Sequence, residues 1–418
     1  MGPTPGSRGA ESTWGTCAAW GTCATWGTCA AWGTWAACGA WSAWFGWVHS
    51  LSLPLLDEVH VPLTGIGDLL APHYGHRVPL PKAALGVLFH LGGLGAMRLA
   101  SWLCAWVGGA VAIHLATRLR GRAAWVDAAF PLLLSGPAYA LSIVHAYDLC
   151  FTLPALLALM AACLLTHRRE GWAALCVVAC LGCGVNGIAL AVSLAACWPL
   201  RGDWRRGAVF ALGTLAFGAA LLVGAEGVDY PDNPLSDQLY TAARLALAVL
   251  DRVLSRWVWS APPVLVFWLG AIAILARRRS VHRAALPLFA GLVGSLATWA
   301  AIAATRSLAP DEDAWVPARY QVLVALPYVF ALLLLARRRS RRATLPAALL
   351  TLALLVALPA ALWHAGRIGG WVDHLEAETR IARASLWTPR EIAEHYGEQL
   401  FPYDRDVLIR SLRVVLGR

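Results

Sequence analysis

Charge is scarce in this chain, and its longest apolar stretches contain none. Only 14% of the residues are Asp, Glu, Lys or Arg, whereas 59% are hydrophobic and the mean hydropathy is +0.59. Soluble domains carry about 25% charged residues, so this composition excludes an ordinary soluble domain. Uncharged stretches of this length are expected of segments that cross a bilayer. They cover residues 149–166, 207–224, 257–276, 285–304, 320–336 and 344–363.

Lysine is nearly absent, because Lys82 is the only one among 34 Lys and Arg residues. So strong a preference for arginine is typical of GC-rich coding, and it makes any single arginine less informative. The formal net charge is +10, but the arginines flank apolar stretches. This arrangement indicates contact with membrane lipids and excludes a nucleic-acid partner.

The 11 cysteines do not indicate disulfides or a zinc site. Four of them belong to an N-terminal repeat, and most of the others lie in apolar stretches, where free cysteine behaves as a small hydrophobic residue. Cys176, Cys180 and Cys183 share a helical spacing but have no acidic or histidine neighbour. We therefore predict no cofactor, although a divalent metal stays open.

Five short loops hold half of the positive charge, 17 of the 34 Lys and Arg residues. Short basic loops stay in the cytoplasm during membrane insertion, so these loops orient the chain. The prediction is an all-α, polytopic membrane helical bundle of about 10–11 spans in a bacterial cytoplasmic membrane. The five loops are residues 118–122, 167–170, 201–206, 277–283 and 337–342.

The loops on the opposite side are acidic. Residues 57–98, 225–256 and 305–318 face the outside in this topology, as does the tail from His364. One apolar segment, 172–199, has basic loops on both flanks, so we expect two short helices broken at residues 184–187. Residues 81–95 fit a helix along the interface better than a full span, and 99–117 fit a span.

Three regions follow from this pattern. Residues 1–41 contain about four copies of a WGTCAA repeat, which favours a poorly ordered leader or a translation start assigned too far upstream. Residues 42–363 form the transmembrane domain, with 57–98 as its first outer loop. Residues 364–418 form a short extracytoplasmic helical tail, which we expect to pack on the outer face of the bundle.

The first outer loop is the densest polar region of the sequence. Asp57 and Glu58 follow the first apolar segment directly, where a carboxylate can act as a general base on an acceptor hydroxyl. A phosphate group could be held by the side chains of His73, His76, Arg77 and Lys82. The alternative is an interfacial loop with ordinary solvated charges. A metal site that includes His60, His73 and His76 is a weaker alternative, since H-x2-H is a loose spacing.

Two further segments contain candidate binding residues. Residues 182–187 match G-x-G-x-x-G formally, but they lie within an apolar segment and follow no strand, which excludes a dinucleotide site. Asn186 in this turn is a candidate hinge or site-facing residue. Arg319 and Tyr320 open a span after an acidic loop, where Arg319 could reach a lipid phosphate or serve only as an interfacial anchor.

Together these residues resemble a group of bacterial polytopic membrane proteins with GT-C-type glycosyltransferase architecture. Members of that group read H-x-E-H-R-x-x-x-P-R where this chain has Gly75 in place of the glutamate and Lys82 in place of the final arginine. The resemblance extends over residues 55–418. It rests on the arrangement of several segments more than on one specific motif. It includes residues 57–58, 73–82, 125–134, 183–190, 319–320 and 400–402.

The resemblance implies a lipid-linked-sugar glycosyltransferase, a hexosyltransferase whose partners are membrane lipids and a polyprenyl-phosphate sugar donor. In such enzymes an acidic residue of the first outer loop is the catalytic base, which corresponds here to Asp57 or Glu58. Two other hypotheses stay open. A transporter would place ionisable groups at mid-membrane, where the stretches above have none. The other is a non-catalytic membrane scaffold, which is favoured by the replacement of the motif glutamate by Gly75.

Overall fold

The computed structural model describes residues 11–54, 58, 69, 77–222, 234–254, 257–276, 285–305, 320–338, 340–384, 387–400 and 405–416. Within these ranges the chain is helical and contains no strand. The prediction of an all-α bundle is therefore confirmed.

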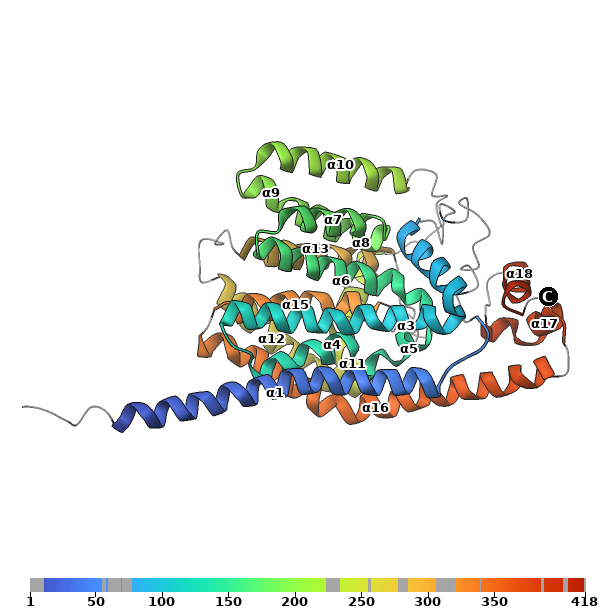
Figure 1. The fold of residues 1–418 in the computed structure, drawn as a ribbon, viewed down its shortest axis with the longest axis horizontal. Helices are drawn as coiled ribbons and strands as arrows, with labels where there is room; N and C mark the ends of the chain where they lie inside the picture. The colour runs from blue at the N-terminus through green and yellow to red at the C-terminus, as the bar shows by residue number, and fades with distance from the viewer. Residues whose placement is uncertain are drawn as a thin grey trace, which may run out of the picture.

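The long helices lie side by side along the longest axis of the molecule (Figure 1). Five helical segments of the described residues are long and apolar enough to cross a membrane, in agreement with an integral membrane protein. The principal helices are α1 (Glu11–Val48), α3 (Pro79–Arg120), α4 (Ala129–Ser135), α5 (Ala140–Val144), α6 (Leu149–Thr166), α7 (Glu170–Leu181), α8 (Val185–Ala195), α9 (Cys197–Leu200), α10 (Trp204–Leu222), α11 (Leu235–Leu254), α12 (Trp257–Ala276), α13 (Leu286–Thr305), α15 (Gln321–Ala336), α16 (Arg341–Ala384), α17 (Pro389–Leu400) and α18 (Arg405–Leu416). Short 3-10 turns η2 (Trp125–Ala128), η3 (Pro137–Tyr139) and η4 (Ala146–Asp148) join α3 to α6.

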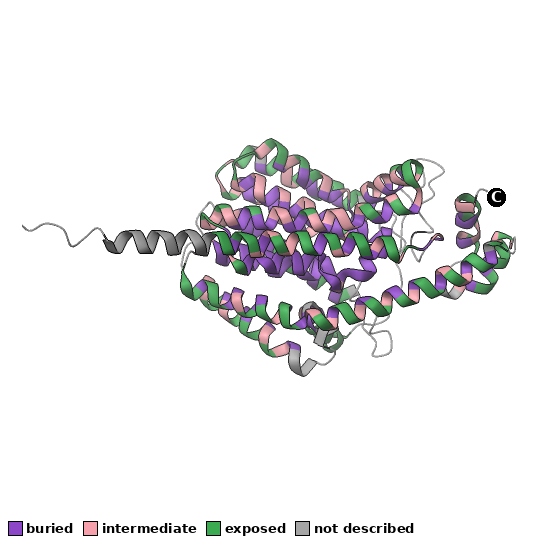
Figure 2. Ribbon diagram, turned by 60° about the horizontal axis from the view of Figure 1, so that its bottom comes forward, coloured by how far each residue is buried: buried purple, intermediate pink, exposed green. Residues whose placement is uncertain are grey.

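The core of the bundle surrounds α15. Every residue of this helix from Gln321 to Ala336 is buried, and Figure 2 shows that burial concentrates in the central helices while the outer faces are exposed. An apolar helix that is buried on all sides is stabilised by its neighbours over its whole circumference.

The basic turns gather at one end of the bundle, which we call the basic end. Arg201 Nη2 donates to Leu165 O at 3.1 Å, so the turn after α9 lies beside the end of α6. Arg338 Nη2 donates to Leu275 O at 3.4 Å, which places the turn after α15 beside the end of α12. The turn after α3 lies at the same end (Figure 1). This grouping agrees with the prediction that the basic loops share one side of the bundle.

Helix α3 consists of two parts. Gly92 and Gly93 leave the helical conformation, with φ −158° and +66°, and the segment before them lies at an angle to the rest (Figure 1). A residue with a Cβ adopts such a positive φ at a cost, so glycine suits the kink. The sequence predicts separate helices at 81–95 and 99–117, and the kink confirms the separation.

Two short helices are also present within 172–199 as predicted, but the break lies at residues 182–184 and not at 184–187. α7 ends at Leu181, and α8 begins at Val185 after Gly184, whose φ is +71°. The two short helices fold back on each other and on α6.

The repeat differs from its prediction. Residues 11–41 form part of helix α1. The sequence instead favours a poorly ordered leader over residues 1–41. Trp35 stacks on Trp106 of α3 with ring centroids 4.1 Å apart. Each indole N–H donates to the carbonyl of the other tryptophan, at 2.9 Å and 3.1 Å. The small residues between the tryptophans allow close approach, since a methyl group on Gly27 would lie 2.9 Å from Ala123 O.

The predicted outer loop 225–256 contains a helix that sequence reasoning missed. α11 packs against α12, α13, α15 and α16, and Tyr328 Oη donates to its Ala246 carbonyl at 2.5 Å. Its strong amphipathicity buries Leu245 and Leu250 while charged residues occupy other positions. Those charges are the reason that hydropathy indicated a loop.

The tail lies at the end opposite to the basic turns, which we call the outer end. The predicted span 344–363 and the predicted tail helix 371–386 form one continuous helix, α16. Thr388 and Glu391 cap α17 reciprocally: Thr388 N–H donates to Glu391 Oε2 at 2.6 Å, and Glu391 N–H donates to Thr388 Oγ1 at 3.2 Å. The tail packs on the end of α1 and on α5 through a cluster that includes Phe45, Leu141 and Tyr396.

Candidate functional site

A buried ion pair connects the first outer segment to α3. Glu58 is 0% exposed and Arg98 is 6% exposed. Arg98 Nε donates to Glu58 Oε1 at 2.9 Å, and Arg98 Nη2 donates to Oε2 at 2.5 Å. A bidentate arginine–carboxylate pair fixes both side chains in position and orientation.

Both partners also bind backbone. Arg98 donates through Nη1 to the carbonyl of Leu51 and through Nη2 to that of Leu53, the latter at 3.1 Å. Glu58 Oε1 accepts the N–H of Ala146 at 2.6 Å. The pair therefore joins three parts of the chain: the segment after α1, the middle of α3 and the turn before α6.

The charge state of Glu58 follows from these contacts. Burial by itself raises the pKa of a carboxyl group, but the charge and hydrogen bonds of Arg98, the charge of His145 and the Ala146 N–H together hold the pKa of Glu58 below its usual 4.5. Glu58 is thus an ionised carboxylate, shielded from solvent, with both oxygens in use. These contacts of Glu58 position Arg98 and occupy both carboxylate oxygens.

A second buried pair lies directly beside the first. His145 Nδ1 and Asp148 Oδ1 are 2.8 Å apart, and both side chains are 1% exposed. Among the described residues, His145 Nε2, Asp148 Oδ2 and the nearby Thr152 Oγ1 are buried without a hydrogen-bond partner. Buried polar atoms without partners are costly and are typical of functional sites.

Sequence reasoning missed His145, Asp148 and Arg98. A signal was present, because His145 and Asp148 are the only His, Asp, Glu, Lys or Arg residues between Asp127 and His167. Arg98 is likewise the only Asp, Glu, Lys or Arg between Lys82 and Arg118. An ionisable residue within an apolar stretch is expensive unless it is paired or functional.

Three predicted binding residues lie around the α7–α8 break. The start of α3 packs on this turn, with the N–H of Leu80 donating to Gly182 O at 2.9 Å. A methyl group on Gly184 would clash with the Arg77 carbonyl. Lys82 is buried, and Asn186 Nδ2 donates to Cys150 O at 3.4 Å. Two sequence motifs about a hundred residues apart are therefore in direct contact.

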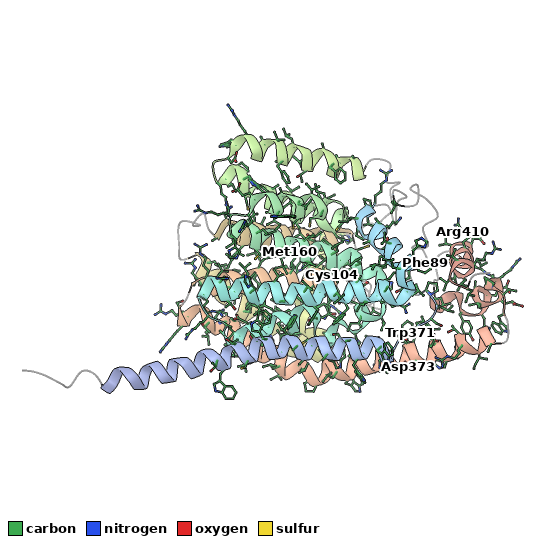
Figure 3. The ribbon with its side chains drawn as sticks, viewed as in Figure 1. Phe89, Cys104, Met160, Trp371, Asp373 and Arg410 are labelled. Carbon is green, nitrogen blue, oxygen red and sulfur yellow. The ribbon has the colours of Figure 1, made fainter. Side chains whose placement is uncertain are left out.

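A large cavity opens beside Arg98 at the outer end. Its volume is about 790 Å³, and it is formed by the end of α1, the middle of α3, α16 and α18. Arg98, Glu376 and Arg380 are its charged lining residues, and most of the rest of the lining is apolar. Figure 3 shows Phe89, which lines the cavity, at the same end as Trp371 and Asp373 of α16.

Helix α16 closes one side of this cavity through contacts with the segment after α1. Glu376 Oε2 accepts from both the N–H and the Oγ of Ser52, each at 2.8 Å. His49 Nδ1 lies 2.9 Å from Asp373 Oδ1. Within 234–254, the described part of the predicted outer loop 225–256, no residue lines the cavity.

The other predicted residues are only partly described. Tyr320 packs against Phe151 of α6, with ring centroids 5.0 Å apart. Asp57, His73, His76 and Arg319 lie outside the described residues, as does His60 of the alternative metal site. Within the described ranges, no group of three or more His, Cys, Asp or Glu side chains is placed to hold a metal ion.

Comparisons of the chain with protein-family models, with curated proteins and with solved structures find no match. The site is therefore interpreted from its own geometry.

Proposed function

We propose that this chain is an integral-membrane glycosyltransferase that moves a sugar from a polyprenyl-phosphate donor to an acceptor on the extracytoplasmic face. The observation that carries the proposal is the cavity of about 790 Å³ at the outer end, whose walls are largely apolar and whose charged groups are Arg98, Glu376 and Arg380. Glu58 and two backbone carbonyls engage Arg98, so the exposed Arg380 is the cation that a ligand would meet. Such a cavity suits a ligand with a hydrocarbon chain and an anionic head. The donor is of this chemical class.

The acidic residue that we assign as base is Asp57. It adjoins Glu58, which is fixed beside the cavity through Arg98. In the proposed inverting reaction, Asp57 takes the proton of the acceptor hydroxyl while the acceptor oxygen bonds to the anomeric carbon of the donor. The bond from that carbon to the phosphate oxygen breaks, and the polyprenyl phosphate leaves with the electron pair.

Cationic side chains would stabilise the leaving phosphate. The carbonyl of Arg77, just before α3, lies against the α7–α8 turn, where Gly184 allows close approach, and Arg77 Nη1 donates to Ala220 O at 3.2 Å. Lys82 is buried in the first turn of α3. His73, His76, Arg319 and Tyr320 complete the set proposed from the sequence, and Asn186 holds the turn to α6. Guanidinium groups bind phosphate in a bidentate manner, which favours Arg77 for this role.

The test is sugar transfer by the purified protein with a panel of polyprenyl-phosphate sugars. Wild type is compared with Asp57→Asn, with Glu58→Gln and with the control Glu394→Gln, which changes an exposed acid of α17 outside the cavity lining. We expect Asp57→Asn to abolish transfer while the unfolding temperature stays unchanged. We expect Glu58→Gln to lower both transfer and unfolding temperature. Loss of transfer in Glu58→Gln at unchanged stability would return the base role to Glu58.

Transfer from no donor, together with no donor binding, would reject the proposal. The membrane transporter and the non-catalytic scaffold are then the remaining hypotheses. They are separated by flux measurements in proteoliposomes, where only a transporter moves solute.

A further inference from the structure

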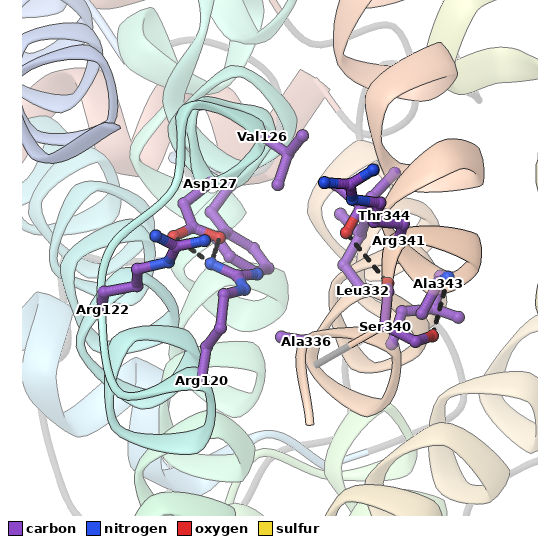
Figure 4. Close-up of a pocket in the computed structure, with 13 residues that line it drawn as sticks. Arg120, Arg122, Val126, Asp127, Leu332, Ala336, Ser340, Arg341, Ala343 and Thr344 are labelled. Atoms are coloured by element: carbon purple, nitrogen blue, oxygen red, sulfur yellow. Dashed lines mark hydrogen bonds and ion pairs between the residues drawn. The ribbon is translucent and has the colours of Figure 1, made fainter. Parts of the chain in front are cut away.

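The basic end of the bundle contains a second cavity that the proposed function does not use. It has a volume of about 360 Å³ and lies between the turn after α3 and the turn before α16. Figure 4 shows Arg120, Arg122 and Asp127 on one side, with Arg341 and Thr344 on the other. Apolar residues of α4 and α15, among them Phe130 and Leu335, form part of its lining.

Asp127 fixes one arginine of this cavity. Its carboxylate is 1% exposed and accepts Arg120 Nη1 at 3.0 Å and 2.8 Å, one contact to each oxygen. Asp127 Oδ2 also accepts the N–H of Ala124 at 2.8 Å. Three guanidinium groups and one carboxylate line the cavity, so the lining has a net formal charge of +2.

The opposite wall adds further positive potential, because a long helix begins there. Ser340 caps α16, since its Oγ accepts the N–H of Ala343 at 3.2 Å. The first N–H groups of a helix carry a partial positive charge and favour anions. The start of α16 and the side chain of Arg341 therefore act in the same direction as Arg122 across the cavity.

We propose that this cavity binds a phosphate group, held between Arg122 and Arg341, with Arg120 kept in place by Asp127. A phosphate presents several acceptor oxygens to guanidinium groups on two sides. Two kinds of ligand present such a phosphate group: an anionic phospholipid, in its headgroup, and free inorganic phosphate. The apolar part of the lining and its place at the end of the spanning helices agree with a headgroup.

The experiment uses the full chain, purified in nanodiscs of phosphatidylcholine with or without phosphatidylglycerol. Bound lipid is counted by native mass spectrometry, and the unfolding temperature is followed in both discs. A separate arm titrates inorganic phosphate into the phosphatidylcholine discs. The test variant is Arg122→Gln/Arg341→Gln. The matched control is Arg118→Gln/Arg342→Gln, which removes one exposed arginine from the last turn of α3 and one from the first turn of α16, both outside the cavity lining.

We expect the wild type to retain phosphatidylglycerol, or to be stabilised by inorganic phosphate, and the test variant to lose about tenfold or more in that affinity. The control should stay within about twofold of wild type. The ligand that raises the unfolding temperature, phosphatidylglycerol or inorganic phosphate, identifies the source of the phosphate. The variant Arg122→Lys/Arg341→Lys retains both positive charges and should restore part of the affinity. It therefore separates loss of charge from loss of folding. Equal losses in test and control variants, or no protection by either ligand, would overturn the proposal.

Discussion

Glu58 and Arg98 form a bidentate ion pair across 40 positions of the chain, with Oε2 and Nη2 2.5 Å apart and both side chains buried. The same guanidinium binds the carbonyls of Leu51 and Leu53. This single arginine therefore places the segment that leads into the first outer loop, and it also forms part of the wall of the large cavity. The pair links the fold to the site that we propose.

Removing one partner should destabilise the protein more than removing both. Arg98→Met or Glu58→Gln leaves its partner buried without its counterpart, which costs about 3–5 kcal/mol. The double variant should recover a large part of that loss. Thermal or denaturant unfolding of the detergent-purified protein, arranged as a double-mutant cycle, measures the coupling. Additive single effects would contradict a specific pair.

Low pH should destabilise the folded protein by protonating Glu58. Its pKa is lower in the folded chain than its usual 4.5, so the stabilisation is fully present above about pH 4.5 and is lost as the pH falls through the folded pKa. The unfolding temperature of wild type should drop over this acid range more steeply than that of Glu58→Gln. Parallel pH profiles of the two proteins would show that Glu58 does not contribute.

Gly184→Ala should disrupt the junction between α3 and the α7–α8 turn. The glycine has φ +71°, and an added methyl group would clash with the Arg77 carbonyl. The backbone strain alone costs about 1–2 kcal/mol. Gly171→Ala is the matched control, because no atom lies within 4 Å of its added methyl group and it lies in α7. Unfolding temperatures compare the two, and a similar loss in both would contradict the predicted clash.

Trp35→Ala should release α1 from α3. The substitution removes the stack on Trp106 and the hydrogen bond from the Trp35 indole to the Trp106 carbonyl. Trp35 is partly buried, so the cost should lie below the roughly 3–5 kcal/mol of a fully buried tryptophan lost to alanine. Trp26→Ala, in the same repeat, should have little effect, since Trp26 is 76% exposed. Limited proteolysis of α1 and unfolding temperature measure the difference. Equal sensitivity of the two variants would show that the repeat does not dock through Trp35.

Hydropathy and loop charge predicted much of the fold because both act locally along the chain. An apolar stretch long enough to cross a bilayer forms a helix wherever it packs, since its backbone groups must bond internally. Glycines that permit φ above zero mark breaks, and so Gly184 lies in both the predicted and the observed break of its segment. Local signals failed at α11, where charged residues obscured a buried face. They also failed at α16, which continues through Gly366, Gly369 and Gly370 between the predicted span and the predicted tail helix.

The sequence by itself determined the helical class, the positions of the apolar segments and the grouping of the basic turns, because each depends on composition and short-range periodicity. Only the tertiary structure distinguished Glu58 from its neighbour. Adjacent carboxylates look alike in a sequence, yet Glu58 meets Arg98 40 positions away and the Ala146 N–H 88 positions away. Burial and those two distant partners set its charge, and neither can be read from the residues beside it.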